Sequence, residues 1–475
     1  MRALHAQWWP RIETSEKFAQ NRAAISAYHA TLRPGDITLV GLIAEGGQGL
    51  ATGNNARFLG YLEGTAQAKH LLEKRAEWTM RWLADAEIAV RFRALLEKAG
   101  GDLDKAMNDS AAWEAVVEPL RAEFPAARLG FSKMDLYRIV PRAVVAGSDD
   151  FEFAWKERKK ELWGRWRSRG ELAGFWKKEP AARVPDAEFC ETCIALRAWV
   201  PVMNEQLRKA NMEPMPKDVL GLRSAECYRD PKDAPRIATI YSGLRGRGQW
   251  VPYSKGDSEG NRWASDQPLF IAWTKPNVEW LFGQSGRPEK GSPVVRNASL
   301  YLLPGVSWSD TGNHVALKAR ELPVSVNDVK SMRLTPIVPE LSSSAFLALL
   351  NSDVVSFWEK KFVNNTCMYQ VNDLRQIPLV IPAPSQAKRL ERLAELAMSA
   401  KRHAFASEPP DNALVAECRR LADQLSAHAP DYLRPPAQAV TFQKPDDCLA
   451  VLERAVNWEA EKLYGVESIG PFDDF

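Results

Sequence analysis

The chain has 475 residues, of which 45% are hydrophobic and 26% are charged. Such values are ordinary for a folded protein and exclude a largely disordered chain, while the length predicts roughly two to four domains. The 63 basic and 60 acidic residues give a formal net charge of +3. The chain is therefore not strongly basic overall, so any nucleic-acid surface has to come from local clusters of Lys and Arg.

The cysteines and apolar runs indicate the compartment. Six cysteines are scattered at positions 190, 193, 227, 367, 418 and 448, which is not the pattern of a disulfide framework. Cys190 and Cys193 form a single CxxC pair without a nearby histidine, so we expect no bound metal. No apolar run reaches about 18 residues, and the first residues lack the apolar segment of a signal peptide. We expect a soluble, cytoplasmic protein without membrane contact.

The glycine-rich loop of residues 46–59 follows a predicted helical leader at 1–35 and an apolar run at 37–43 that predicts a buried strand. Its glycines, three of them in positions 46–49, allow positive φ and close backbone approach. Its polar side chains are of the types that hydrogen-bond phosphates and base edges, namely Gln48, Thr52, Asn54, Asn55 and Arg57. A plain turn between two strands has the same pattern, so both interpretations remain open.

Residues 66–124 carry apolar side chains at helical spacing, with breaks at Gly100-Gly101 and Pro125. We expect a helical insertion over about 66–180 within a domain of residues 36–385. The segment 151–178 inside it is the most basic of the chain and interleaves tryptophans with cations. Its candidate DNA contacts are Lys156, Lys159, Arg165, Arg167 and Arg169. An amphipathic helix with solvated charges explains this segment equally well.

The second half of the chain alternates strands and helices. Strands are predicted at 237–241, 269–273, 299–303 and 379–382, and helices at 344–358, 385–428 and 446–464. The last two helical stretches predict a C-terminal helical region at 386–475. The fold class expected from these elements is α/β, of the mixed α+β kind.

Motifs of common catalytic sites are absent from the sequence, which has no GxxxxGK[ST], HExxH or GxSxG. The six histidines are dispersed without metal-ligand spacing. Asp150, Glu157 and Lys159 resemble the Asp…Glu-x-Lys set of metal-dependent nucleases, a pattern that a charged helix also produces by chance.

Further stretches place aromatic rings beside amide or cationic groups, which suits contact with a DNA groove or base. The candidates at 248–263 are Trp250, Tyr253, Lys255, Arg262 and Trp263. A stretch at 305–310 centres on Trp308. The candidates at 364–379 are Asn364, Asn365, Tyr369, Gln370 and Arg375.

Taken in order, the stretches 49–59, 250–256 (Trp-Val-Pro-Tyr-Ser-Lys-Gly), 307–309 (Ser-Trp-Ser), 350–352 (Leu-Asn-Ser) and 373–378 (Asp-Leu-Arg-Gln-Ile-Pro) resemble a known family. They are similar to the C-terminal, target-recognition half of large adenine-specific DNA methyltransferases. These enzymes belong to phage-defence systems of the BREX (phage growth limitation) and DISARM kind and to fused type II restriction–modification proteins. The strand ending in Ile-Pro before long helices also resembles type I specificity subunits.

The chain departs from this family at the catalytic motifs. The Asn/Asp-Pro-Pro-Tyr/Phe loop that holds a flipped adenine is missing, because Glu408 precedes Pro409-Pro410 and Arg434 precedes Pro435-Pro436. The resemblance therefore implies no catalytic residue and no cofactor in this chain. It implies double-stranded DNA and a separate methyltransferase catalytic subunit as partners, with S-adenosylmethionine bound by that subunit. The alternatives are a non-catalytic scaffold of a phage-defence complex and the metal-dependent nuclease.

Overall fold

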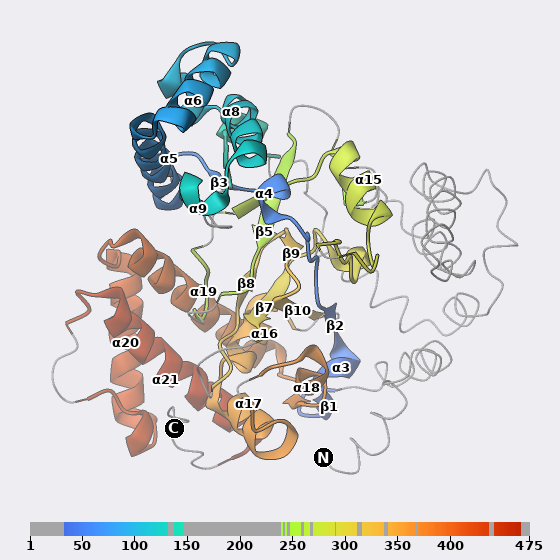
Figure 1. Cartoon of the computed structure of the whole chain (residues 1–475). Helices are drawn as coiled ribbons and strands as arrows, with labels where there is room; N and C mark the ends of the chain where they lie inside the picture. Colours follow the sequence, from blue (N-terminus) through green and yellow to red (C-terminus); the bar gives the residue numbers. More distant parts are fainter. Residues whose placement is uncertain are drawn as a thin grey trace, which may run out of the picture.

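The computed structural model describes residues 33–131, 137–146, 239–240, 243–244, 248–257, 261–266, 269–289, 291–310, 316–336, 341–366, 368–436 and 441–466. Within these ranges helices and mixed sheets alternate along the chain, so the predicted α/β fold class is confirmed (Figure 1). The predicted leader helix, the basic segment at 151–178, the CxxC pair and the nuclease-like set lie outside the described residues. The division into domains stays a prediction.

The described strands form three sheets. A five-stranded sheet has the order β4-β3-β6-β5-β9, with the bounds β3 Leu59–Leu62, β4 Arg138–Val140, β5 Trp250–Ser254, β6 Leu269–Ala272 and β9 Val326–Asn327. A four-stranded antiparallel sheet has the order β2-β10-β7-β8, with β2 Ala44–Gly47, β7 Gly305–Ser309, β8 Arg320–Leu322 and β10 Ser331–Pro336. A small sheet pairs β1 (Ile37–Leu39) with β11 (Pro378–Val380).

Helices surround the sheets. The predicted insertion contains α5 Ala66–Ala84, α6 Ala86–Lys98, α7 Leu103–Asn108, α8 Ser110–Glu123 and α9 Ala126–Leu129. Short helices are α3 Val40–Ile43, α4 Asn55–Phe58 and α18 Val371–Leu374, with 3₁₀ turns at Arg142–Val144, Ala298–Leu300 and Asp431–Leu433. The remaining helices are α15 Lys275–Gly283, α16 Ser343–Leu350, α17 Asp353–Trp358 with a following π turn at Glu359–Val363, α19 Pro384–Ala406, α20 Asn412–His428 and α21 Pro445–Tyr464.

Side-chain caps explain where the insertion helices begin. Thr65 accepts a hydrogen bond from the amide of Ala68 at the start of α5, and Asp85 does so for Ile88 at the start of α6. Asp102 and Asp109 cap α7 and α8 in the same way. Each cap satisfies an amide that has no partner within its own helix, and such a cap stabilises a helix by about 1 kcal/mol.

The five-stranded sheet shares a hydrophobic core with α5–α9 and α15, called here the N-terminal core. It includes Phe58, Trp82, Trp113, Tyr253 and Ile271. The Trp82 ring stacks on Trp113 with centroids 5.6 Å apart, and its indole nitrogen donates to the carbonyl of Leu129 at 3.0 Å. Several of the 17 tryptophans therefore serve packing, because their large apolar rings are buried with the indole N–H satisfied.

The four-stranded sheet shares a second core with α16, α19, α20 and α21, called here the C-terminal core. It includes Trp308, Leu334, Phe346, Leu393 and Leu452. Figure 1 shows the two cores stacked, with α5–α9 at one end of the molecule and α19–α21 at the other. The C-terminal helices are thus not an appendage, because their apolar faces pack on the same core as the sheet.

The glycine-rich stretch is the crossing between the two sheets. Gly46 and Gly47 pair with β10, and a Cβ atom on Gly46 would lie 2.0 Å from the carbonyl oxygen of Arg333. A Cβ on Gly49 would lie 1.8 Å from the carbonyl oxygen of Asn327, and Gly53 has a φ of +70°. These positions demand glycine because two backbones approach closely and because one turn is left-handed.

Several predicted elements differ from the structure. Residues 37–43 form β1 followed by α3, not one strand, and Thr239 and Ile240 are helical. The stretch 299–303 forms no strand: residues 299–300 end a 3₁₀ turn and 301–302 form a further turn. The buried Arg333 side chain bonds the carbonyls of Leu300 and Leu303 that a ladder would use.

Helices predicted as continuous are broken by local caps. The helix at 344–358 is interrupted at residues 351–352, where the Ser352 hydroxyl caps α17. The helix at 385–428 is divided after Ser407, which has a φ of 55°, before Asp411 caps α20. These short polar side chains compete with helix continuation by bonding the next turn.

Candidate nucleic-acid interface

The loop after the glycine crossing is held by its own polar side chains. The Thr52 hydroxyl donates to Asn55 Oδ1 at 2.5 Å, and Asn55 Nδ2 donates to the Tyr137 hydroxyl at 3.4 Å. Asn54 Oδ1 accepts from the amide of Arg57 at 3.3 Å and so caps the short helix α4. Thr52, Asn54 and Asn55 therefore fix the loop that presents Arg57 to solvent.

Arg57 is exposed, and its guanidinium stacks on an aromatic ring. Its Cζ atom lies 4.5 Å from the Trp280 ring centroid and 5.2 Å from that of Phe58. Among the described residues its guanidinium has no carboxylate or carbonyl partner, so its N–H groups remain available. Partial burial, and then the nearby charge of Arg138, lower the pKa of Arg57 from its usual value. An arginine stacked in this way is pre-organised to donate to an anionic or planar acceptor.

A hollow of about 340 Å³ adjoins Arg57 between α4 and α8. Its wall includes Asn54, Trp113, Arg121 and Arg138 together with two carboxylates. Arg138 is paired with Glu114, and Arg121 with Glu118. Arg57 is therefore the cation in this hollow whose charge no described carboxylate neutralises.

Lys255 reaches the same loop through Tyr137. Its Nζ donates to the Tyr137 hydroxyl at 2.9 Å, and that hydroxyl also contacts Asn55. The neighbouring Tyr253 is buried, and its hydroxyl lies 2.6 Å from Asp328 Oδ2 and 3.1 Å from the carbonyl oxygen of Leu50. Burial raises the pKa of Tyr253 well above its ordinary value, so it is a neutral hydrogen-bonding anchor.

Gln48 lies at the start of the loop, against the segment before β7. Its side chain accepts from Arg296, and its carbonyl accepts from Asn297 Nδ2 at 2.9 Å. Both partners are exposed. Sequence reasoning missed Arg296, Asn297, Tyr137 and Trp280, because each is far away in the chain and none lies in a motif of its own.

The stretch 364–375 joins the opening of the same loop. Arg375 Nη2 donates to the carbonyl of Gly46 at 2.7 Å, and burial lowers the pKa of Arg375. Asn364 Nδ2 donates to Asp373 Oδ2 at 2.8 Å, and the amide of Gln370 donates to the same carboxylate at 3.2 Å. Asn365 is exposed. These residues mainly close a turn against the glycine crossing.

Arg262 and Trp263 lie elsewhere, at the junction with α21. The Trp263 indole nitrogen donates to Glu453 Oε1 at 2.8 Å, and Arg262 Nη1 lies 3.4 Å from the same oxygen. Both residues therefore dock the C-terminal helices on the body of the molecule.

Four predicted aromatic contacts are packed inside the protein. Trp250, Tyr253, Trp263 and Tyr369 are all buried. None presents a face on which a base could stack, because each fills a core or anchors a loop. These four rings are therefore left out of the candidate interface. The candidates that remain in it are Arg57, Asn54, Gln48 and Lys255. The basic candidates at 156–169 lie outside the described residues.

The structure also shows a buried carboxylate, Glu359, beside the 364–375 stretch, and no sequence pattern had pointed to it. Glu359 begins the π turn, is fully buried, and has no hydrogen-bond partner for either carboxylate oxygen among the described residues. Burial, reinforced by the charge of Asp373, raises the pKa of Glu359 to about 8. The group is therefore largely protonated at neutral pH.

Membrane spans, metal sites and related proteins were also sought for this chain. In the described ranges, no helix is both long and apolar enough to cross a membrane, and no group of three metal-ligating side chains occurs. No protein-family model matches the chain, and no curated protein matches it.

Proposed function

We propose that this chain is the DNA sequence-recognition part of an adenine-specific, S-adenosylmethionine-dependent DNA methyltransferase in a phage-defence or restriction–modification system. In this proposal it lacks the catalytic domain. A partner subunit supplies the cofactor and the methyl transfer, and the complex works on double-stranded DNA in the cytoplasm.

One observation supports the proposal best: separated stretches of the sequence resemblance contact one another or residues that flank another stretch. Tyr253 anchors the loop at Leu50, and Arg375 binds the carbonyl of Gly46. Trp308 donates to the carbonyl of Tyr369 at 2.8 Å. Tyr253 and Arg375, which are hundreds of residues away in the chain, thus both bond to the backbone of the glycine-rich stretch, as expected of a recognition domain assembled from these motifs.

The chemistry of the exposed loop suits DNA. Arg57 has a stacked guanidinium with free donors, and Asn54 lies in the same hollow. Lys255 places a second cation on the Tyr137 side of the loop. In the proposal these cations meet phosphates or a guanine edge, while Gln48 and its partner Arg296 extend the surface.

The test uses the purified chain and a fluorescent duplex in anisotropy titrations at several salt concentrations. We expect binding that weakens steeply as salt rises, because phosphate contacts release counterions. With labelled S-adenosylmethionine, the chain alone transfers no methyl group, and transfer appears when its catalytic subunit is added. Methylation by the isolated chain, or no salt-sensitive binding to any duplex, contradicts the proposal. The second result, combined with intact binding to a methyltransferase, identifies a scaffold instead.

A further inference from the structure

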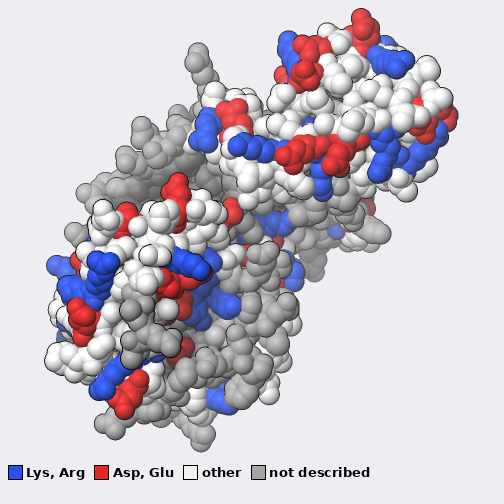
Figure 2. Space-filling view, turned by 90° about the vertical axis from the view of Figure 1, so that its left-hand side faces the viewer, with Lys and Arg blue, Asp and Glu red and all other residues white. Residues whose placement is uncertain are grey.

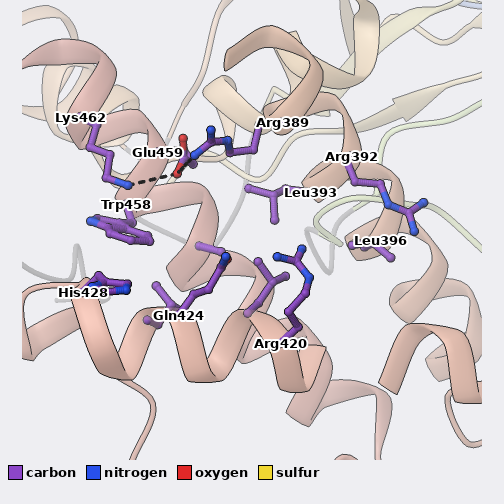
Figure 3. Close-up of a pocket in the computed structure, with 13 residues that line it drawn as sticks. Arg389, Arg392, Leu393, Leu396, Arg420, Gln424, His428, Trp458, Glu459 and Lys462 are labelled. Carbon is purple, nitrogen blue, oxygen red and sulfur yellow. Dashed lines mark hydrogen bonds and ion pairs between the residues drawn. The ribbon is translucent and has the colours of Figure 1, made fainter. Parts of the chain in front are cut away.

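A hollow of about 380 Å³ lies among α19, α20 and α21, far along the chain from the glycine-rich loop. It is called here the basic groove, and its lining includes Arg389, Arg392, Arg420, Trp458, Glu459 and Lys462 together with leucines of α19 and α20. Figure 3 shows labelled side chains of the three helices around this space, with the end of Arg392 at its edge.

The groove lies where α19 and α20 diverge over α21. Both α19 and α20 pack on α21, while α19 and α20 touch each other little along their length. Its floor is apolar, with leucines at helical spacing at 393 and 396 on α19 and at 421 and 425 on α20. Trp458 of α21 is half-buried beside them. Such a gap between two helices over a third accepts a fourth helix.

The rim of the groove is cationic. Four permanent cations, Arg389, Arg392, Arg420 and Lys462, face a single lining carboxylate, Glu459. Glu459 is shared by Arg389 at 3.2 Å and Lys462 at 3.3 Å, and Arg420 pairs with Glu417. In the part of the chain that the structure describes, Arg392 has no hydrogen-bond or ion-pair partner. The rim therefore keeps an excess of positive charge over an apolar floor.

This excess is local. Figure 2 shows basic and acidic side chains interspersed over the helical lobes. Near the groove, the ion pairs Arg402–Glu321 at the end of α19 and Arg434–Asp431 after α20 illustrate the mixing. The groove thus differs from its surroundings in having both unbalanced cations and an apolar base.

We propose that the basic groove binds an amphipathic helix of a partner protein, in which acidic residues flank an apolar stripe. The apolar stripe would rest on the leucines and Trp458, and the carboxylates would meet Arg392 and its neighbours on the rim. The apolar floor disfavours a nucleic-acid backbone, whose charged phosphates gain nothing from leucine side chains. This inference goes beyond the recognition function and does not depend on DNA binding.

The rim side chains are exposed, whereas the leucines of the floor are mostly buried. Leu393 is 3% exposed and Leu425 is 1% exposed, because both also pack in the C-terminal core. Arg389, Arg392 and Arg420 are exposed at their ends.

The test uses a fluorescent synthetic peptide of about 15 residues, with leucines at helical spacing and glutamates beside them. We expect it to bind the full chain, and Arg392→Glu to weaken binding about tenfold by replacing attraction with repulsion. Lys388→Glu is the matched control: Lys388 is exposed on the same helix but does not line the groove, so its reversal should leave affinity unchanged. Duplex binding by Arg392→Glu should also be unchanged, which separates this test from that of the proposed function.

Companion peptides decide the chemistry. Replacing the leucines by serines, or the glutamates by lysines, should abolish binding. The proposal is overturned if the acidic peptide does not bind, if the serine peptide binds equally well, or if Lys388→Glu weakens binding as much as Arg392→Glu.

Two other occupants are tested in the same experiment. If the peptide binds only a chain shortened after Val466, the chain's own C-terminal segment is the occupant. If sedimentation shows a dimer that Arg392→Glu dissociates, a second copy is the occupant. Either result overturns the assignment to a partner protein.

Discussion

At the residue scale, Arg57 shows how a surface cation is held in one orientation. Stacking on Trp280 holds the guanidinium plane, and the Asn54 cap holds the backbone that carries it. A free arginine side chain loses considerable rotamer entropy on binding, and this residue has already lost part of it. The positive charge of the neighbouring Arg138 also disfavours the charged form of Arg57. An anion that binds Arg57 would offset this repulsion.

Arg57→Ala should weaken duplex binding about tenfold, because a hydrogen bond to a charged group is lost. If Arg57 contacts a DNA phosphate, the slope of the logarithm of the binding constant against the logarithm of the salt concentration should decrease in size by about one. Arg91→Ala is the control, since it removes the same charge from α6, where Glu123 already neutralises it. Anisotropy titrations measure both effects, and equal losses for the two variants would refute the role of Arg57.

Glu359 predicts a pH dependence of stability. Its pKa rises from an ordinary 4.5 to about 8 in the folded protein. The folded state therefore keeps a proton that the unfolded state releases, so stability falls as pH rises from 4.5 to about 8 and levels off above it.

Glu359→Gln keeps the shape of the protonated acid but cannot ionise. The loss of folding stability between pH 4.5 and about 8 that comes from Glu359 should therefore be absent in this variant. The variant should melt at a temperature similar to that of the wild type at acidic pH and at a higher one above pH 8. Thermal melts across this range measure the difference. A constant offset between the two proteins at every pH would show that Glu359 does not titrate in this way.

At the element scale, the glycine crossing couples two sheets through backbone contacts. Gly49 lies so close to Asn327 that the methyl group of an alanine at position 49 would clash with the carbonyl oxygen of Asn327. A change of side-chain rotamer cannot relieve this clash, because the carbonyl belongs to the backbone. The loop that carries Thr52, Asn54, Asn55 and Arg57 begins directly after this contact. A disturbance at Gly49 should therefore displace Thr52, Asn54 and Asn55 as well.

Gly49→Ala should destabilise the protein by about 3 kcal/mol or more, since the inserted methyl group overpacks a backbone contact. Gly35→Ala is the comparison, because its Cβ meets nothing within 4 Å and the change costs only the strain of a φ of +90°, about 1–2 kcal/mol. Denaturant unfolding of both variants gives the values. A smaller loss for Gly49→Ala than for Gly35→Ala would exclude the proposed close contact.

At the scale of the whole molecule, the C-terminal helices belong to the same core as the four-stranded sheet. Leu390, Leu393 and Leu452 pack in one cluster with Trp308 and Leu334. Glu453 also receives the indole N–H of Trp263. Partner binding at the basic groove would therefore act on helices that contact the body of the protein directly.

A chain ending at residue 383 should lose the packing of its C-terminal core. It should bind a dye for exposed apolar surface and lose near-ultraviolet dichroism from buried tryptophans, whereas a chain ending at residue 466 should not. A shortened chain that stays monomeric and unfolds with unchanged cooperativity would show that the helices fold separately.

The sequence by itself determined those features that depend on local patterns. The α/β class, the helices after residue 66, strand β6 and the C-terminal helices followed from apolar periodicity and from glycine and proline breaks. The resemblance of five ordered stretches also came from the sequence alone, and its functional meaning stays a proposal. Composition could not show that many tryptophans are core residues, because burial depends on partners that are distant in the chain.

Only the tertiary structure decided which candidates share a place and which are hidden. It brought Tyr137, Lys255 and Asn55 together, separated Arg262 and Trp263 from them, and buried Tyr253 and Tyr369. It also kept residues 299–303 out of a strand, and the distant Arg333 bonds the carbonyls of Leu300 and Leu303. The physical reason is the same in each case: long-range packing and buried hydrogen bonds outweigh the weak local preferences that a sequence displays.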